Sequence, residues 1–392
     1  MKKVSTKLES QYYFKIKKNM PILVVWILLM IYWILAVFSV SIHKSFTLTL
    51  ALGGDPTNYF YFVRHLKSII IAIVTALIVY RIPISFFQKQ KNIIIITIIV
   101  FVLQILVFVP WIWIEINWAR WWLDIPFLPS IQPSEFFKLW YVLFIAWWLI
   151  RKKKSIDNDN QLTLSFIVIN IFSLLIFIFI PDFGSALVMG LTGLIMAFYT
   201  WMGRKKVIGI LVIWVSGAII FGTIASRFST RFAYLQKRMS YFISAPNDED
   251  SKWVGWQNEQ ALAAIWWWGF AWKWYWKWLQ KFGYLPEAQS DFVFAAFSEE
   301  VWFLGAIALL WLYFYLMYYV ITKLVYVKDE YSKMIAIGLL SLIIIQAFIN
   351  IGVNLKILPN TWLTLPFISH GGTAIMTNII SLMILYKIIK NR

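Results

Sequence analysis

The sequence predicts an all-α integral membrane protein with about ten transmembrane helices and one large extracytoplasmic loop. The first observation is composition: 61% of the 392 residues are hydrophobic and only 14% are charged. A soluble domain of this length could not bury so much apolar surface. The second observation is pattern, because long apolar runs recur between short polar segments. The chain has no Cys, which excludes a disulfide framework.

Each apolar run is about long enough for a tilted helix that crosses the hydrocarbon core. The first run follows a polar, basic tail that lacks the pattern of a cleavable signal peptide. One connection, 227–300, is much longer than the others, and no repeat or linker divides the chain. We therefore expect 1–392 to form a single polytopic membrane domain. The predicted spans are 21–42, 59–80, 93–113, 135–150, 162–181, 184–202, 206–226, 301–322, 334–356 and 365–388.

Basic residues gather in the N-terminal tail and in every second loop, and this alternation predicts the orientation. The positive-inside rule places both termini in the cytoplasm, with 1–20 as a basic tail and the loop 227–300 outside. The net charge of +18 does not indicate a nucleic-acid partner, because the cations form short clusters between apolar runs. The clusters are Lys2, Lys3, Lys7, Lys15, Lys17 and Lys18; Arg81, Lys89 and Lys91; Arg151–Lys154; Arg204–Lys206; Lys323, Lys328 and Lys333; and Lys387, Lys390 and Arg392.

Polar residues collect at the opposite, outer rim, where they indicate a site for a charged, lipid-attached substrate. In IQPSEFFKL, Ser134 is placed to cap the next helix, and Glu135 and Lys138 share one helix face. A capped helix end with an ion pair explains this motif equally well. The rim residues are Asn117, Arg120, Gln132, Ser134, Glu135 and Lys138; Asp182; Glu287, Asp291, Glu299 and Glu300; and Ser369, His370, Gly371 and Gly372.

Two acidic residues of the rim have simple structural explanations when each is taken alone. Asp182 in PDFGSAL is explained by a turn after Pro181. Asp291 in PEAQSDFVFAAFSEE is explained by a helix cap, although the three further acids near it make a cap less satisfactory. The order of these motifs along the chain is more informative than any one of them.

In that order the motifs resemble the SEDS family, the FtsW/RodA and SpoVE-like membrane glycosyltransferases of bacterial cell-wall synthesis. The resemblance covers nearly the whole chain and is slightly nearer the FtsW division branch. It implies an architecture of about ten helices with a large outer loop. It rests on NWARWWL at 117–123, QPSEFFK at 132–138, PDFGSALV at 181–188, GYLPEAQSDFVFAAFSEEVWFLGA at 283–306 and LPNTWLTLPFISHGG at 358–372.

The resemblance implies polymerisation of lipid II by direct inverting displacement, which needs one general base and stabilisation of the departing diphosphate. Asp291 matches the essential Asp of the family and is the expected base, or a ligand for a divalent cation, Mg²⁺ or Mn²⁺. Glu135 and Lys138 match an E-x-x-K pair expected to bind substrate. Arg120 is a second candidate for the diphosphate. Asp182 and Ser369 complete the substrate-binding candidates, and Asp182 is the weaker of these because it also suits a structural role.

The resemblance also implies partners and a location. The expected partners are lipid II, a class B penicillin-binding protein and other proteins of the division or elongation complex, in the bacterial cytoplasmic membrane. Two alternatives stay open: a lipid II flippase and a non-catalytic scaffold of the division machinery. A flippase should place charges at the membrane midplane, whereas a scaffold needs none of Asp291, Glu135 and Lys138.

Trp stands where the family usually has Gly. Trp118, Trp302 and Trp362 occupy such places, and WWWGFAWKWYWKW at 266–278 resembles a run of Gly and Lys. Gly permits a positive φ and close backbone approach, whereas Trp adds a large ring, so repeated natural exchange is not expected. We hypothesise that many of the 24 Trp are UGA codons for Gly that were translated as Trp. The alternative is an aromatic belt at the membrane interface.

Overall fold

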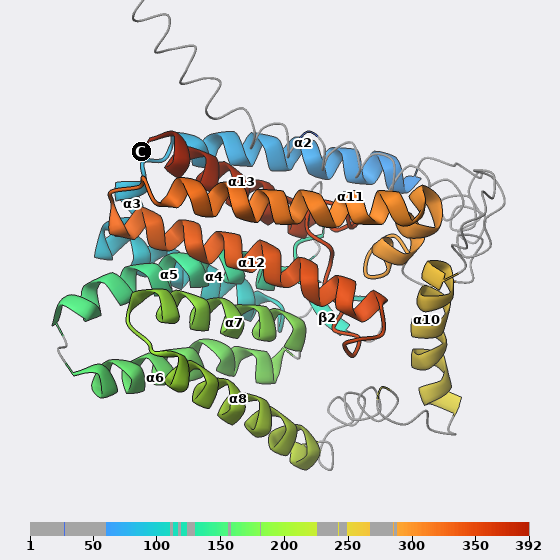
Figure 1. The fold of residues 1–392 in the computed structure, drawn as a ribbon, viewed down its shortest axis with the longest axis horizontal. Helices are drawn as coiled ribbons and strands as arrows, with labels where there is room; N and C mark the ends of the chain where they lie inside the picture. Colours follow the sequence, from blue (N-terminus) through green and yellow to red (C-terminus); the bar gives the residue numbers. More distant parts are fainter. Residues whose placement is uncertain are drawn as a thin grey trace, which may run out of the picture.

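The computed structural model describes residues 60–109, 113–116, 119–123, 130–155, 158–180, 182–225, 249–266 and 288–391, together with Ile27, Phe242 and Leu285. These residues form a bundle of long helices that run in nearly the same direction or its reverse (Figure 1). The predicted span 21–42 and the tail 1–20 lie outside the described residues, apart from Ile27. The elements are α2 (Phe60–Arg81), α3 (Ile84–Gln88), α4 (Gln90–Leu106), β1 (Trp113–Ile116), β2 (Ala119–Leu123), α5 (Pro133–Ser155), α6 (Asp159–Phe179), α7 (Phe183–Thr200), α8 (Arg204–Ala225), α10 (Glu249–Trp266), α11 (Val293–Leu324), α12 (Glu330–Asn354) and α13 (Gly372–Lys390).

Each predicted span from 59–80 onward coincides with one of the long helices. Five of the described helical segments are both long and apolar enough to cross a membrane, namely Asp159–Phe177, Phe183–Thr200, Leu304–Leu324, Glu330–Asn354 and Gly372–Lys390. Gln90–Leu106 is apolar but shorter. The predicted class, an all-α multi-pass membrane protein, is therefore confirmed in this coarse form.

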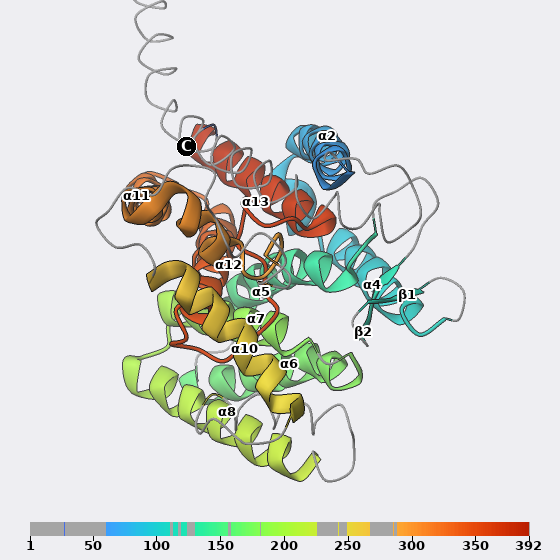
Figure 2. The ribbon, with the colours of Figure 1, turned by 90° about the vertical axis from the view of Figure 1, so that its right-hand side faces the viewer.

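The helices are ordered from α2 on one side of the bundle to α8 on the other. Figure 1 shows α2 and α13 at one edge, α12, α5 and α7 in the middle, and α6 and α8 at the far edge. The end-on view in Figure 2 shows α12 and α5 surrounded by other helices. Exposed apolar side chains such as Ile98, Phe172 and Ile213 lie on the outer surface, as expected for contact with lipid tails.

The centre of the bundle is closely packed. A Cβ placed on Gly338 of α12 would lie 2.5 Å from Val142 Cγ1 of α5 and 2.8 Å from Met196 Sδ of α7. Gly338 therefore lets three helices approach closely, because lipid tails supply no hydrophobic force and tight packing must hold the helices together. Phe137 and Tyr141 of α5 are fully buried in this core.

Hydrogen bonds join the cationic loops at one end of the bundle, which we call the basic end. Lys387 Nζ donates to the Tyr80 carbonyl, and Lys153 Nζ donates to the Thr200 carbonyl over 2.8 Å. Tyr331 donates to the Phe87 carbonyl over 2.9 Å. Figure 1 shows this end at the left, and β2 and α10 lie toward the other. The cationic loops that the sequence assigned to one side of the membrane thus lie together.

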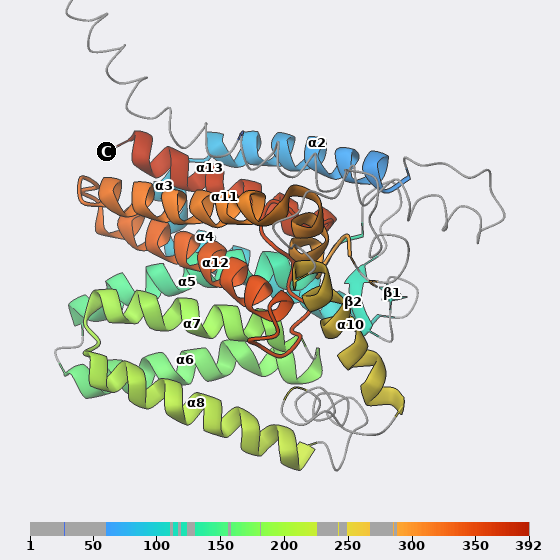
Figure 3. The ribbon, with the colours of Figure 1, turned by 45° about the vertical axis from the view of Figure 1, so that its right-hand side comes forward.

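Three features differ from the sequence prediction. The third loop contains a two-stranded antiparallel hairpin, β1–β2, with Trp113 opposite Leu123. Helix α10 lies within the predicted loop 227–300 and across the end of the bundle (Figure 3). Helix α11 begins at Val293, eight residues before the predicted span, because Phe294, Ala295 and Phe297 are apolar and buried and continue the helix past the acidic pair.

Candidate functional site

The predicted pair in α5 forms a short, buried ion pair. Lys138 Nζ lies 2.8 Å from Glu135 Oε1, and the two side chains are 1% and 5% exposed. Buried charges are stable only when they are paired and hydrogen-bonded. Lys138 Nζ also donates to Gln346 Oε1 of α12 over 2.9 Å. The pair thus belongs to the interior of the bundle rather than to an open surface.

Further hydrogen bonds extend this pair to α13 and to the segment before it. Gln346 Nε2 donates to the Thr364 carbonyl over 2.9 Å and to Thr364 Oγ1 over 3.1 Å. Thr377 Oγ1 of α13 donates to Glu135 Oε2 over 3.2 Å. Both carboxylate oxygens of Glu135 therefore accept a hydrogen bond, and one network joins α5, α12 and α13.

Asp182 is the N-cap of α7. Its Oδ1 accepts from the Ser185 backbone N–H over 3.0 Å, and its Oδ2 accepts from Ser185 Oγ over 2.8 Å. Oδ2 also accepts from Ser134 Oγ over 2.7 Å and from Gln132 Nε2 over 3.3 Å. The prediction that Ser134 caps α5 is wrong, because the helix begins before it at Pro133 and its hydroxyl donates to Asp182.

Asp291 lies in the turn just before α11, in a partly exposed position. Its backbone carbonyl accepts from Asn350 Nδ2 over 2.8 Å and from Asn354 Nδ2 over 3.0 Å. Asn354 Oδ1 in turn accepts from the backbone N–H of Ala295, in the first turn of α11. Asn350 and Asn354 are almost fully buried in α12. The start of α11, and with it Asp291, is therefore fixed to α12.

The segment before α13 is joined to the residues next to Asp291. Ser369 Oγ donates to the Ser290 carbonyl over 2.5 Å and accepts from the Leu365 backbone N–H over 2.6 Å. The His370 backbone N–H donates to the Gln289 carbonyl over 2.8 Å. Ser369 is itself buried. Its hydroxyl therefore connects the segment before α13 to the residue next to Asp291.

A family model described as cell cycle protein, covering FtsW, RodA and SpoVE, matches residues 19–392. The chain belongs to the FtsW/RodA/SpoVE family. The family's probable peptidoglycan glycosyltransferase FtsW from Nitrosomonas europaea is 29% identical over 350 residues, which cover 88% of this chain and 86% of that protein. Stage V sporulation protein E from Bacillus subtilis is 33% identical over 291 residues, 74% of this chain and 77% of its own.

Solved structures share the fold of this FtsW/RodA/SpoVE chain. RodA of Thermus thermophilus matches with a TM-score of 0.63 at 18% identity, over 95% of this chain and 96% of that one. A chain from a study of polymerization and crosslinking by a peptidoglycan synthase complex matches with a TM-score of 0.66 at 19% identity. That match covers 91% of this chain and 97% of the other.

The predicted site residues that the structure describes lie toward one end of the bundle, namely Glu135, Lys138, Asp182, Asp291 and Ser369. Gln346, which binds Lys138, and Asn350, which binds the Asp291 carbonyl, are one turn or about 6 Å apart along α12. Arg120 lies on β2, and its side chain is outside the description. Asn117 and Glu287 also lie outside the described residues.

The sequence reasoning missed Gln346, Asn350 and Asn354. These amides follow one another at four-residue spacing on one face of an otherwise apolar helix. Polar groups inside a membrane helix are costly, so this spacing was the signal that could have identified them. They connect the buried ion pair to the backbone of Asp291.

Proposed function

We propose that the chain is a peptidoglycan glycosyltransferase that polymerises lipid II into glycan strands at the outer face of the bacterial cytoplasmic membrane. Family membership and the names of its relatives support the reaction. The assignment of the site rests on the hydrogen bonds that Asn350 and Asn354 donate to the backbone carbonyl of Asp291. A carboxylate on a fixed backbone, partly exposed and away from the cationic loops, suits a general base.

In the proposed reaction a sugar hydroxyl of the acceptor attacks the anomeric carbon of the donor. The new glycosidic C–O bond forms as the bond from that carbon to the lipid diphosphate breaks, and the configuration inverts. The hydroxyl proton passes to the Asp291 carboxylate, and the diphosphate leaves with the bonding electron pair. This displacement needs one base and no second carboxylate as nucleophile.

Cationic groups must stabilise the departing diphosphate. We assign this role to Arg120, since a guanidinium group matches phosphate geometry and β2 lies at the same end of the bundle as the start of α11 (Figure 3). Lys138 is 1% exposed, so its contact with substrate requires a rearrangement of the bundle. In the described state, Glu135 and Lys138 join α5 to α13 and α12, Asp182 joins the starts of α5 and α7, and Ser369 joins the segment before α13 to Ser290.

A divalent cation, Mg²⁺ or Mn²⁺, is compatible with this arrangement. Among the described residues, no three His, Cys, Asp or Glu side chains converge into a metal site. Mg²⁺ commonly binds one or two carboxylates together with substrate phosphates and water, so Asp291 with the lipid diphosphate is a sufficient donor set. The cation would neutralise charge on the diphosphate.

The location of the buried charges favours a polymerase over a flippase. Lys138 lies five residues after the start of α5, about 7.5 Å along the helix axis. The midplane of a bilayer core lies about 15 Å from its edge. Glu135, about 3 Å along the axis, is therefore near the rim, and Lys138 is about halfway to the midplane, where a transported substrate would bind.

The proposal includes an orientation and a partner. The basic end faces the cytoplasm with both termini, by the positive-inside rule. A class B penicillin-binding protein crosslinks the new strand, which is supported by the fold shared with a chain of a peptidoglycan synthase complex. The motifs favour the division branch slightly.

The test is polymerisation of labelled lipid II by the purified chain with its partner, whose transpeptidase is blocked. Asp291→Asn keeps the size of the side chain and removes its charge. General-base contributions are about 10²–10⁴-fold, so glycan strands should fall below detection on a gel. Asp159→Asn is the matched control, because Asp159 is exposed in the first turn of α6 at the basic end. It should leave strand length unchanged.

Three other outcomes have separate meanings. Equal strands from wild type and Asp291→Asn would remove Asp291 from the mechanism. No strands from any protein would support the scaffold or the flippase. Movement of labelled lipid II across vesicles by both proteins, without strands, would single out the flippase.

A further inference from the structure

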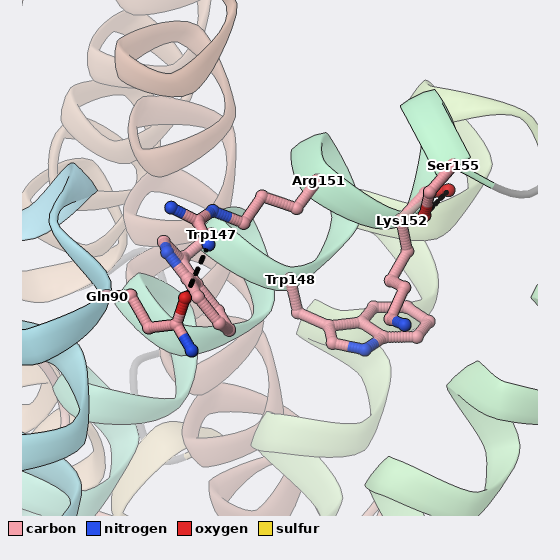
Figure 4. A pocket seen from close by; sticks show the side chains of 6 residues that line it. All are labelled: Gln90, Trp147, Trp148, Arg151, Lys152 and Ser155. Atoms are coloured by element: carbon pink, nitrogen blue, oxygen red, sulfur yellow. Dashed lines mark hydrogen bonds between the residues drawn. The ribbon is translucent and has the colours of Figure 1, made fainter.

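A cavity lies at the basic end, far from Asp291. It has a volume of about 480 Å³ and is lined by Gln90 of α4 and by Trp147, Trp148, Arg151, Lys152 and Ser155 of α5. In Figure 4, Gln90, Trp147 and Arg151 lie on the side of α5 that faces α4, and Trp148 and Lys152 extend to the other side of α5. None of the lining residues carries a carboxylate. The cavity therefore presents two cations and two indoles without an internal counter-charge.

Two hydrogen-bond donors at this cavity, the Arg151 guanidinium and the Trp147 indole N–H, suit an anionic ligand. Arg151 lies over the ring of Trp147, 4.8 Å from its centroid, and Nη1 donates to Gln90 Oε1 over 2.8 Å. These contacts orient the guanidinium but leave most of its five donors for a ligand. The indole N–H of Trp147 is buried and has no acceptor among the described residues. A buried donor without a partner is costly, and a ligand oxygen would satisfy it.

The basic residues at the end of α5 extend in different directions. Lys153 turns away and donates to the Thr200 carbonyl. Lys152 is four residues after Trp148 on the same helix face, and in Figure 4 its side chain runs toward that indole. Cations at a helix C-terminus are favoured by the dipole and by the positive-inside rule, which explains the charge. Neither effect explains the cavity or the unpaired indole.

We propose that this cavity binds the headgroup of an anionic phospholipid from the membrane leaflet at the basic end. Arg151 would bind the phosphate, Lys152 would add positive charge on the side of Trp148, and the indole N–H of Trp147 would donate to a phosphate or ester oxygen. The apolar surfaces of the indoles would cover the glycerol and the upper acyl chains, which is the usual place of Trp at a membrane interface. Basic pockets between transmembrane helices recognise such headgroups.

The experiment is native mass spectrometry of the full chain in detergent, titrated with phosphatidylglycerol, with phosphatidylcholine or with soluble glycerol 3-phosphate. The test variant is Arg151→Gln/Lys152→Gln. The matched control is Arg204→Gln/Lys205→Gln, which removes the same two kinds of charge from adjacent exposed positions at the same end. Each cation near an anionic surface increases the binding affinity about fivefold. The test variant lacks two cations, so it should bind phosphatidylglycerol about 30-fold more weakly than wild type. The control should bind as wild type does.

Arg151→Lys keeps the charge and should retain most of the affinity. Equal loss in both double variants would show diffuse attraction by net charge and overturn the proposal. Unchanged binding in the test variant would exclude the cavity as the site. If glycerol 3-phosphate competed fully with phosphatidylglycerol, the ligand of the cavity would be a soluble phosphate compound and not a lipid. None of these outcomes depends on polymerase activity.

Discussion

Residue 362 combines a Trp side chain with a backbone that suits Gly. Trp362 has φ of 54°, in the left-handed region, and its N–H donates to Asn360 Oδ1 over 3.1 Å. The family resemblance implies Gly at this place of the LPNTW motif, and a positive φ is consistent with the hypothesis that a Gly codon was read as Trp. Lys356 and Phe367 also have positive φ, so the dihedral alone would not identify the codon. Trp302 lies within α11, where no such backbone is needed.

Comparison of Trp362→Gly with Trp362→Ala isolates the backbone effect. Both variants lose the packing of the indole against the cluster of Val107, Leu123 and Ile180, so that loss cancels between them. The Gly variant should be more stable by about 1 kcal/mol, the cost of holding a Cβ-bearing residue in the left-handed region. Thermal unfolding of the two purified proteins measures the difference. Equal stability would remove the backbone argument, and UGG codons at Trp118, Trp268, Trp272, Trp302 and Trp362 would refute the codon hypothesis itself.

At the scale of elements, α5, α12 and α13 are joined by the network around Glu135 and Lys138. We expect Lys138→Met to destabilise the fold by about 3–5 kcal/mol, because it leaves the Glu135 carboxylate buried without its cation. Glu135→Gln in the same chain should recover much of this loss, since Gln still accepts from Thr377 and carries no charge. Thermal unfolding of the single and double variants measures both. A double variant no more stable than Lys138→Met would contradict the ion-pair account.

The long helices could be predicted from hydropathy because each requires only a run of apolar residues. The hairpin β1–β2, helix α10 and the first residues of α11 could not. Trp113 and Leu123 pair across the hairpin, and the alternation in so short a segment is too weak to distinguish strand from loop. Because residues 299 and 300 are acidic, hydropathy placed the start of α11 after them. The helix begins at Val293, and the buried Phe294 and Phe297 lie in its first turns.

The candidate site was predictable where local spacing determines contact. Glu135 and Lys138 pair at i,i+3, and such pairs are set by helix geometry. The bonds of Asn350 and Asn354 to Asp291 join residues about 60 positions apart, so only the packing of α11 against α12 brings them together. The role of Asp291 itself stays a prediction that the polymerisation assay tests.

At the scale of the whole molecule, cationic loops gather at one end of the bundle. Lys387, Lys153 and the loop at Phe87 all take part in hydrogen bonds of the basic end. We expect a reporter fused after residue 392 to be active in the cytoplasm, because the end of α13 lies among these cations. Paired cytoplasmic and periplasmic reporters measure this, and a fusion in the loop 227–300 should give the opposite signal. A periplasmic signal from the C-terminal fusion would reverse the orientation.

The pairing of α2 with α13 has a consequence for synthesis of the chain. The two helices lie side by side in Figures 1 and 2, and Lys387 binds a carbonyl of Tyr80, 307 residues earlier. The rings of His65 in α2 and His370 before α13 are 4.8 Å apart, and His65 is fully buried. Ribosomes add about 5–20 residues per second, so α2 waits roughly 15–60 s for its neighbour to emerge. During that time the face of α2 that carries His65 and Ser68 meets lipid or the insertion machinery, and the bundle closes only after α13 has been translated.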